Sequence, residues 1–428
     1  MRIDRLTVTN FKKFREESFE LHPQFTLLVG DNGTGKTAIL DALRIGAGAY
    51  LLGIPHSQAP SIKREYIRRE TRRNGEFSSF EPMTPCRVGC AGHAHRSDFD
   101  WTRELASLNG RTNRVGARAL TKCVAEHFRE NNPETNFPLI VSYSTGRLWI
   151  EPRTTKQARS AVREPLGKSS RFQAYRGSLD PAVSSDLLRR WIKKMALISI
   201  QKDQTLESLQ AVYSAIVGCV EGVDQALYDF DLDDIALDFS TKERYPFGFL
   251  SDGQRTMTAL AADIALRCVQ LNPHLGREAP SETEGVALID ELDLHLHPNW
   301  QRAVVRNLTT LFPKIQFIAS THSPFIIQSL SGHGLVNLSD ESLLVERREY
   351  FSIEDVAEET MGVDCPQRSK LFLEMEVAAE RYYSLLDNLN DNHADIQKAK
   401  AELNQIEARF SDNPAYAALL KLRRSAVE

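Results

Sequence analysis

Apolar positions near the start of the chain fit two strands followed by a helix. Residues 2–11 (RIDRLTVTNF) alternate in polarity and residues 25–30 (FTLLVG) form a short apolar run, with Pro23 between them. Both patterns are typical of β-strands. In residues 35–52 the apolar side chains recur at helical spacing instead. We therefore expect two strands and then a helix.

The segment between residues 55 and 245 is patterned less regularly. It predicts short strands around 85–101, a helix near 117–130, a buried strand within 137–149, and helices over 183–200 and 205–220. Residues 151–182 are polar and basic without a clear period. We expect a loop or flexible insert there.

Beyond residue 245 helices and strands alternate regularly. The pattern predicts helices over 251–271, over 299–312 and after 321, and buried strands over 285–291 and 314–321. Because strands that alternate with helices form parallel sheets, we expect an α/β fold with a mostly parallel core sheet. From about residue 366, three amphipathic segments predict a helical C-terminal tail.

Composition is that of a soluble globular protein. The 428 residues are 42% apolar and 26% charged, which suits one large domain or two ordinary ones. The charged start lacks the apolar segment of a secretory signal, and no apolar run approaches the roughly 20 residues of a membrane helix. We expect a cytoplasmic protein without a membrane partner. The six cysteines are mostly scattered, which favours reduced thiols over a disulfide framework.

One cluster has the residue types of a zinc site. It comprises Cys86, Cys90, His93 and His95, all ordinary zinc ligands. The same stretch alternates in polarity and leads into DFDWTREL, which predicts a pair of strands. No second pair follows at zinc-finger spacing, so we favour strands over a metal site.

Charge is distributed unevenly along the chain. The net charge is −4, yet residues 61–200 carry 26 Lys and Arg against 14 Asp and Glu. One short run within this segment holds Arg68, Arg69, Arg72 and Arg73. If this run is helical, several of them share a face that would follow a phosphate backbone, which makes them candidate DNA contacts. The alternative is a solvated basic surface, because no aromatic pattern for base stacking accompanies them.

Residues 30–37, GDNGTGKT, match the motif G-x-x-x-x-G-K-[ST] between an apolar strand and a helix. The glycines let backbone N–H groups curl around phosphate oxygens, and the helix N-terminus adds its positive dipole end. Lys36 is expected to reach the β- and γ-phosphates of ATP, and Thr37 to ligate Mg²⁺. The predicted ATP-binding residues are Asp31, Asn32, Gly33, Thr34, Gly35, Lys36 and Thr37.

Two carboxylates and a histidine follow later predicted strands. Asp290 and Glu291 end the apolar run VALIDE, and His322 follows the strand that ends in IAST. Parallel sheets bind ligands at the carboxyl ends of their strands, so we expect these side chains beside the phosphates. Asp290 would hold Mg²⁺, and Glu291 would polarise the attacking water. His322 would contact the γ-phosphate and orient that water.

The stretch FLSDGQRT, residues 249–256, places Ser251 as the N-cap of a long helix. Ser251 and the backbone N–H groups near Gly253 have the same anion-binding chemistry as the P-loop. Because a nucleotide is already enclosed by the P-loop of its own chain, we expect this helix end to face ATP on another copy. The contacts predicted in trans are Ser251, Asp252, Gly253 and Gln254. Two ATP molecules would then lie between two chains, and hydrolysis would loosen the pair.

The order of GDNGTGKT, LSDGQ, ALIDELDLHLHP and STHSP resembles that of ABC-type ATPases of the SMC, RecF and OLD branch. The start, RIDRLTVTNFKKF, is similar to that branch as well. The resemblance implies an ABC-type ATPase domain over 1–350, whose ATP-binding core lies in about 1–50 and 245–350. A basic, irregular and helical insert would lie between the two parts, over about 55–240. The expected fold also includes an antiparallel β subdomain and a helical subdomain. Residues 351–428 would form a helical C-terminal region.

Several features of the sequence restrict which members of this branch the chain can resemble. Asp252 stands where the transporter signature has Gly, and no Gln follows a clear strand in the interval expected for the Q-loop. The interval from Thr37 to Leu250 lacks sustained heptads, so we exclude long coiled-coil arms. The segment after Gly332 lacks the acidic pattern of a TOPRIM nuclease. We expect an ATPase that uses Mg²⁺ and has no nuclease activity of its own.

An ATPase of this branch without arms or TOPRIM domain resembles the PtuA-type subunits of Septu and related retron anti-phage systems. In those systems the ATPase works with a separate HNH endonuclease, a PtuB-like subunit. The resemblance implies an oligomer that holds this nuclease, with the C-terminal helices as candidate docking surface. The alternative for these helices is a plain helical cap. Two other functions stay open, a RecF-like DNA repair ATPase and a scaffold in which ATP is structural and turnover is low.

Overall fold

The computed structural model divides the chain into two units, Met1–Val356 and Ala357–Glu428. It describes residues 1–74, 77–130, 132–145, 171–179, 185–330, 332, 334–339, 343–344, 351–363, 366–388, 394–407 and 409. All the strands of this described part belong to the first unit. Within it, no helix is long and apolar enough to cross a membrane.

A six-stranded sheet forms the centre of the first unit, in the order β15-β14-β3-β13-β12-β8. Its strands are β3 (Phe25–Val29), β8 (Leu139–Tyr143), β12 (Gly285–Ile289), β13 (Ile315–Ser320), β14 (Gly334–Asn337) and β15 (Leu343–Leu344). The pairs from β14 to β8 are parallel, and β15 is antiparallel to β14. All residues of β3, β12 and β13 are buried, as expected for strands covered on both faces. The predicted α/β fold with a mostly parallel sheet is confirmed.

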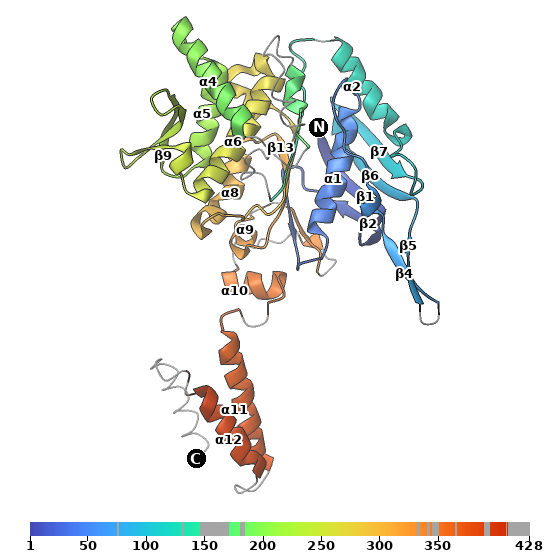
Figure 1. Cartoon of the computed structure of the whole chain (residues 1–428), viewed down its shortest axis with the longest axis vertical. Helices are drawn as coiled ribbons and strands as arrows, with labels where there is room; N and C mark the ends of the chain where they lie inside the picture. The colour runs from blue at the N-terminus through green and yellow to red at the C-terminus, as the bar shows by residue number, and fades with distance from the viewer. Residues whose placement is uncertain are drawn as a thin grey trace. The chain divides into compact units, whose positions relative to one another are not determined.

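Helices cover both faces of this sheet. Figure 1 shows α1 on one side of β13, and α5, α6 and α8 on the other. The helices of the unit are α1 (Lys36–Leu51), α2 (Arg118–Glu130), α4 (Ser185–Lys202), α5 (Glu207–Cys219), α6 (Asp252–Leu271), α7 (Ala279–Glu282), α8 (Pro298–Leu311), α9 (Pro324–Gln328) and α10 (Ile353–Asp355). Short 3₁₀ turns connect them: η1 (Arg64–Tyr66), η2 (Val115–Ala117), η3 (Arg171–Tyr175), η4 (Phe247–Phe249) and η5 (Pro273–Glu278).

A four-stranded antiparallel sheet, β2-β1-β6-β7, packs against the other face of α1. Its strands are β1 (Arg2–Phe11), β2 (Phe14–Glu20), β6 (Cys86–Ala94) and β7 (Ser97–Leu105). Cys90 packs on Gly46 of α1, and the indole of Trp101 donates to the Gly46 carbonyl at 2.9 Å. The sheet confirms the predicted antiparallel subdomain. The sequence analysis missed β2, because its FREESFE pattern is mostly charged and exposed.

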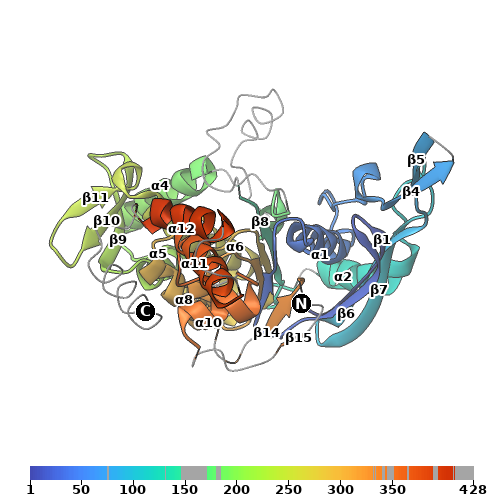
Figure 2. The same ribbon diagram turned by 90° about the horizontal axis from the view of Figure 1, so that it is seen from below.

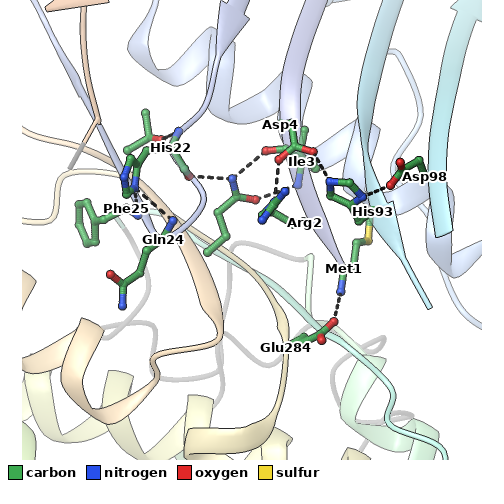
Figure 3. Close-up of polar contacts among 12 residues, drawn as sticks. Met1, Arg2, Ile3, Asp4, His22, Gln24, Phe25, His93, Asp98 and Glu284 are labelled. Atoms are coloured by element: carbon green, nitrogen blue, oxygen red, sulfur yellow. Dashed lines mark hydrogen bonds and ion pairs between the residues drawn. The ribbon is translucent and has the colours of Figure 1, made fainter. Parts of the chain in front are cut away.

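Hydrogen bonds join this antiparallel sheet to the central one. The amide of Ile3 donates to the Gln316 side chain at 2.8 Å, and Gln316 donates back to the Ile3 carbonyl at 2.7 Å. Figure 3 shows the neighbouring Asp4 flanked by Arg2 and His93. The buried Gln316 side chain therefore holds β1 against β13. This contact also positions the antiparallel sheet that packs on α1.

Two smaller sheets lie at opposite ends of the first unit, as Figure 2 shows. One is the hairpin of β4 (Arg69–Asn74) and β5 (Phe77–Pro82). The other is the antiparallel sheet of β9 (Val223–Asp229), β10 (Asp234–Phe239) and β11 (Arg244–Pro246). Arg244 bridges this second sheet through Asp229 and Asp238. The sequence analysis assigned no structure to its strands.

The second unit is a helical hairpin with its own small core. Helices α11 (Lys370–Asn388) and α12 (Ala394–Glu407) follow the π-helical turn η7 (Val356–Thr360). Phe372, Met375 and Leu403 are buried between them. Two of the three predicted C-terminal helices are confirmed, whereas the third, over 413–428, lies outside the described residues.

A candidate nucleotide site

The P-loop lies between β3 and α1, in the backbone conformation that the glycines require. Gly33 and Gly35 have φ of 84° and 106°, where a side chain would be strained. A Cβ on Gly35 would also lie 2.7 Å from the ring of Phe14, the first residue of β2 after the turn between β1 and β2. This turn had no role in the sequence analysis, and it brings Lys13 beside the loop as well.

Lys36 is held inside the loop by backbone carbonyls. Its Nζ donates to the carbonyls of Gly30 at 2.6 Å and Asp31 at 2.9 Å. Burial lowers the pKa of Lys36, and nearby carboxylates, Asp290 foremost, oppose that shift. The ammonium group therefore lies inside the loop, within reach of any phosphate oxygens that bind there. Asp31, Asn32, Gly33 and Thr37 are exposed.

The predicted magnesium residues meet at the end of β12. The Thr37 hydroxyl lies 3.3 Å from one carboxylate oxygen of Asp290. The other oxygen accepts a hydrogen bond of 2.6 Å from Ser320, at the end of β13. The same Ser320 hydroxyl accepts from the backbone N–H of Glu291 at 2.8 Å. One buried serine that the sequence analysis did not single out therefore positions both acidic residues.

His322 also reaches this end of the sheet. Its backbone N–H donates to Asp293 at 3.2 Å, and Asp293 also accepts from the hydroxyl of Thr321 at 2.6 Å. The turn after β12 and the turn after β13 are thus joined by hydrogen bonds. The prediction that both strand ends lie together is consistent with parallel pairing of Ile289 with Ala319.

Strand β8 adds a third strand end to the site. Its last residue, Tyr143, pairs with Ile289, and its carbonyl accepts from the N–H of Asp290 at 2.8 Å. Ser144 and Thr145 therefore follow directly beside Asp290, where the sequence offers hydroxyl groups and no Gln. The sequence feature that could have identified Ser144 and Thr145 is a Ser-Thr pair at the end of an apolar strand. The same pair occurs in VSYST and in IAST.

Ser251 caps α6 as predicted. Its hydroxyl accepts from the Gln254 N–H at 3.3 Å, while the Gln254 side chain accepts from the Ser251 N–H at 2.9 Å. Ser251 and Asp252 are exposed, whereas Gly253 is buried. Within the described residues no hydrogen bond or ion pair joins residues 251–254 to the P-loop. The P-loop and the start of α6 are therefore separate features of one chain.

The arginine run corrects an expectation. Arg69, Arg72 and Arg73 lie in strand β4 and Arg68 just before it, so the predicted shared helical face is wrong. Adjacent residues of a strand point to opposite faces. Arg68 pairs with Glu70, and Arg72 pairs with Glu81 at 2.9 Å. Pairing with β5 across the hairpin, which spacing alone does not reveal, decides this conformation.

The cysteines and histidines of the zinc candidate separate in the structure. Cys86 and Cys90 are buried. His93 lies between Asp4 and Asp98, and His95 contacts the Tyr50 hydroxyl at 2.7 Å. Among the described residues, no three or more His, Cys, Asp or Glu side chains are grouped to hold a metal ion.

One family model and several known proteins match this chain. The family model described as the RecF/RecN/SMC N terminal domain matches residues 2–340. The Retron Ec83 probable ATPase of Escherichia coli is 25% identical over 404 residues, which cover 78% of this chain and 71% of that protein. The Septu protein PtuA of Bacillus mycoides (strain KBAB4) is 34% identical over 206 residues, covering 44% and 27%. The SMC head domain from Thermotoga maritima covers 78% of this chain and 95% of that chain with a TM-score of 0.43 and 16% identity.

Proposed function

This chain belongs to the RecF/RecN/SMC family of ATPases, and we propose that two copies enclose two ATP molecules and regulate a separate HNH endonuclease in anti-phage defence. The observation that carries the proposal is the hydrogen-bonded set at the P-loop: Thr37, Asp290, Ser320 and Glu291. These are the groups that in-line attack on a γ-phosphate needs, and they lie at one edge of the sheet.

Binding would use the P-loop backbone and two side chains. Lys36 would exchange the Gly30 and Asp31 carbonyls for β- and γ-phosphate oxygens. The hydroxyl of Thr37 and the carboxylate of Asp290 are hard oxygen donors, so this pair fits Mg²⁺. When bound, Mg²⁺ would neutralise charge on the phosphate oxygens. Lys13, beside Gly35, would add a second cation to the triphosphate.

Hydrolysis would depend on Glu291 as general base. Its backbone is fixed by the hydrogen bond to Ser320 and has a φ of 50°, an unusual conformation for a residue with a side chain. This geometry turns Glu291 away from the straight continuation of β12. Its carboxylate would take a proton from the attacking water, and His322 would hold that water against the γ-phosphate.

The second copy would complete the site through the start of α6. Ser251 uses its oxygen to accept the capping hydrogen bond, which leaves its proton to donate to a γ-phosphate. The first turn of α6 adds the positive end of a 20-residue helix. Exposure of Ser251 and Asp252 supports an approach from outside the chain. Gln254 would act through the cap.

The defence role is proposed from the relatives, whose names are those of a retron probable ATPase and a Septu protein. The helical hairpin α11–α12 is the proposed docking element for a subunit or the HNH endonuclease. Candidate DNA contacts at Arg68, Arg69, Arg72 and Arg73 have weaker support, because Arg68 and Arg72 already pair with glutamates.

The test compares the wild type with Glu291→Gln by ATP turnover and light scattering. We expect turnover in the wild type, its loss in the variant, and an ATP-dependent dimer that accumulates in the variant. Adding Ser251→Arg should abolish this dimer while one chain still binds ATP. A Glu291→Gln protein that stays a monomer at saturating ATP would refute the shared site. Wild-type protein without turnover would favour the structural-scaffold alternative. A neighbouring reading frame for an HNH protein that co-purifies with this chain would favour defence over RecF-like repair, and its absence would favour repair.

A further inference from the structure

The segment between β7 and α2 is rich in arginine and has no acidic residue. Residues 106–122 contain Arg111, Arg114, Arg118 and Lys122, and no Asp or Glu. The segment lies along the edge strand β7, because the Asn113 N–H donates to the Glu104 carbonyl at 2.6 Å. At η2, a Cβ on Gly116 would lie 2.7 Å from the Thr102 carbonyl. The arginines are therefore carried on a backbone that is packed in place.

Three of these arginines are exposed and have no acidic neighbour to satisfy them. Arg111, Arg114 and Arg118 are exposed. In the part of the chain that the structure describes, none of their three side chains makes a hydrogen bond or ion pair. Lys122 differs, because it lies 3.9 Å from Glu126. Arg87 of the neighbouring strand β6 also has a partner, Glu104.

Arg103 of β7, whose charge is close to that of Arg114, is an independent observation at this segment. It is 2% exposed, and its Nε and Nη1 have no hydrogen-bond partner in the described part of the protein. Its neighbour Glu104 points to the opposite face of β7 and pairs with Arg87. Burial lowers the pKa of Arg103 to about 10, and the positive charge of Arg114 contributes to that shift.

An uncompensated buried cation is strongly unfavourable, and native proteins rarely keep one without a use. Here its charge adds to that of the three exposed arginines. The first turn of α2 also lacks an acidic residue, so the positive end of the helix dipole is not neutralised by its own sequence. The charges of the four arginines and the N-terminal end of the α2 dipole are all positive and act on one surface.

We propose that this β7–α2 arginine surface, made of Arg111, Arg114 and Arg118 above Arg103, binds the phosphodiester backbone of DNA. Several unpaired cations spread along one segment suit a chain of phosphates better than a single small anion. The proposal goes beyond the proposed ATPase function and does not depend on ATP turnover. It also distinguishes this surface from the β4–β5 hairpin, where Arg68 and Arg72 are paired with glutamates.

The test uses the full chain and a labelled mixed-sequence DNA duplex, with Kd measured between about 50 and about 200 mM salt. The variant Arg111→Gln/Arg114→Gln/Arg118→Gln should weaken binding at least about tenfold and lower the slope of log K against log salt by about 2 to 3. The matched control, Lys193→Gln/Lys314→Gln, removes two exposed lysines that already pair with Asp233 and Glu282, and should change that slope by less than about 1. Thermal unfolding of both variants checks that each is folded.

Arg103→Met gives a second test, in which thermal stability and DNA binding should change in opposite directions. Removing an unpaired buried charge should raise the melting temperature, while DNA binding should weaken several-fold. A lower melting temperature would mean that Arg103 has a partner inside the protein, and would overturn its part in the surface. An unchanged salt slope in the triple variant, no DNA binding at low salt, or equal binding of the sulfated polymer heparin with no binding of DNA would each overturn the proposal.

Discussion

The backbone carbonyl of His295 lies 2.8 Å from the position that a Cβ would occupy on Gly253. The start of α6 therefore packs directly against the turn that follows β12. Glycine is needed here because a backbone carbonyl, unlike a flexible side chain, cannot move away cheaply. Residues 251–254 thus contact the turn that follows Asp290 and Glu291 in the same chain, although the two segments would serve different ATP molecules in a dimer.

Gly253→Ala should separate these two segments. The added methyl group must push α6 from the turn, so we expect a loss of about 1 to 3 kcal/mol in the free energy of unfolding. ATP-dependent dimerisation should fall as well, whereas ATP binding by the P-loop of a single chain should persist. Urea unfolding and nucleotide titration measure the two effects. For stability alone, the control is Asp252→Ala, which loses the exposed ion pair with Arg255 and should cost less than about 1 kcal/mol.

Ser320→Ala should lower turnover without abolishing ATP binding. Its hydroxyl orients Asp290 and Glu291 together, so its loss leaves both carboxylates less well positioned. We expect kcat to fall about 10- to 100-fold with little change in KM. Ser329→Ala is the control, because that hydroxyl contacts only the Ile326 carbonyl. Equal kcat in both variants would exclude the positioning role.

Tyr143→Phe should weaken the link between β8 and α6. The Tyr143 hydroxyl donates to Asp263 at 2.7 Å, and Asp263 also accepts from Arg267 at 2.8 Å. Since this bond to a charged group is buried, we expect a loss of about 1.5 to 3 kcal/mol in the free energy of unfolding. Tyr175→Phe, which loses a bond to the neutral carbonyl of Pro138, should cost about 1 kcal/mol. Urea denaturation of both variants checks the difference.

His95 should make the protein less stable in acid. Burial, with His127 stacked on its ring, lowers the pKa of His95 to about 3, from an ordinary value of 6.5. Between these values the unfolded chain binds a proton that the folded protein does not, so stability falls as pH drops below 6.5. At about pH 5 this group alone should cost about 2 kcal/mol relative to neutral pH.

The measurement is urea unfolding of the wild type and of His95→Gln at about pH 7.5 and about pH 5. Glutamine keeps a hydrogen-bonding group for Tyr50 and does not titrate. The variant should therefore lose less stability on acidification than the wild type. An identical loss in both proteins would show that other groups carry the pH dependence.

Local sequence patterns were sufficient for the central part of this protein. GDNGTGKT, the runs VALIDE and IAST, and the Ser251 cap each lie within one strand–turn or turn–helix unit. Such units are specified by the residues that form them, through glycine conformations, continuous apolar runs and capping side chains. The α/β class and the mostly parallel sheet followed from the order of these units.

Tertiary structure decided everything that depends on residues distant in the chain. Whether the arginine run near residue 70 forms a strand is set by pairing with β5, and the place of Ser144 is set by the pairing of β8 with β12. The roles of Ser320 and Gly253 arise from contacts across about 30 and about 40 residues. Arg103 resembles any strand arginine in sequence, and only packing leaves it buried without a counterion. The physical reason is that local propensity fixes the elements, while burial and hydrogen bonding between elements choose their neighbours.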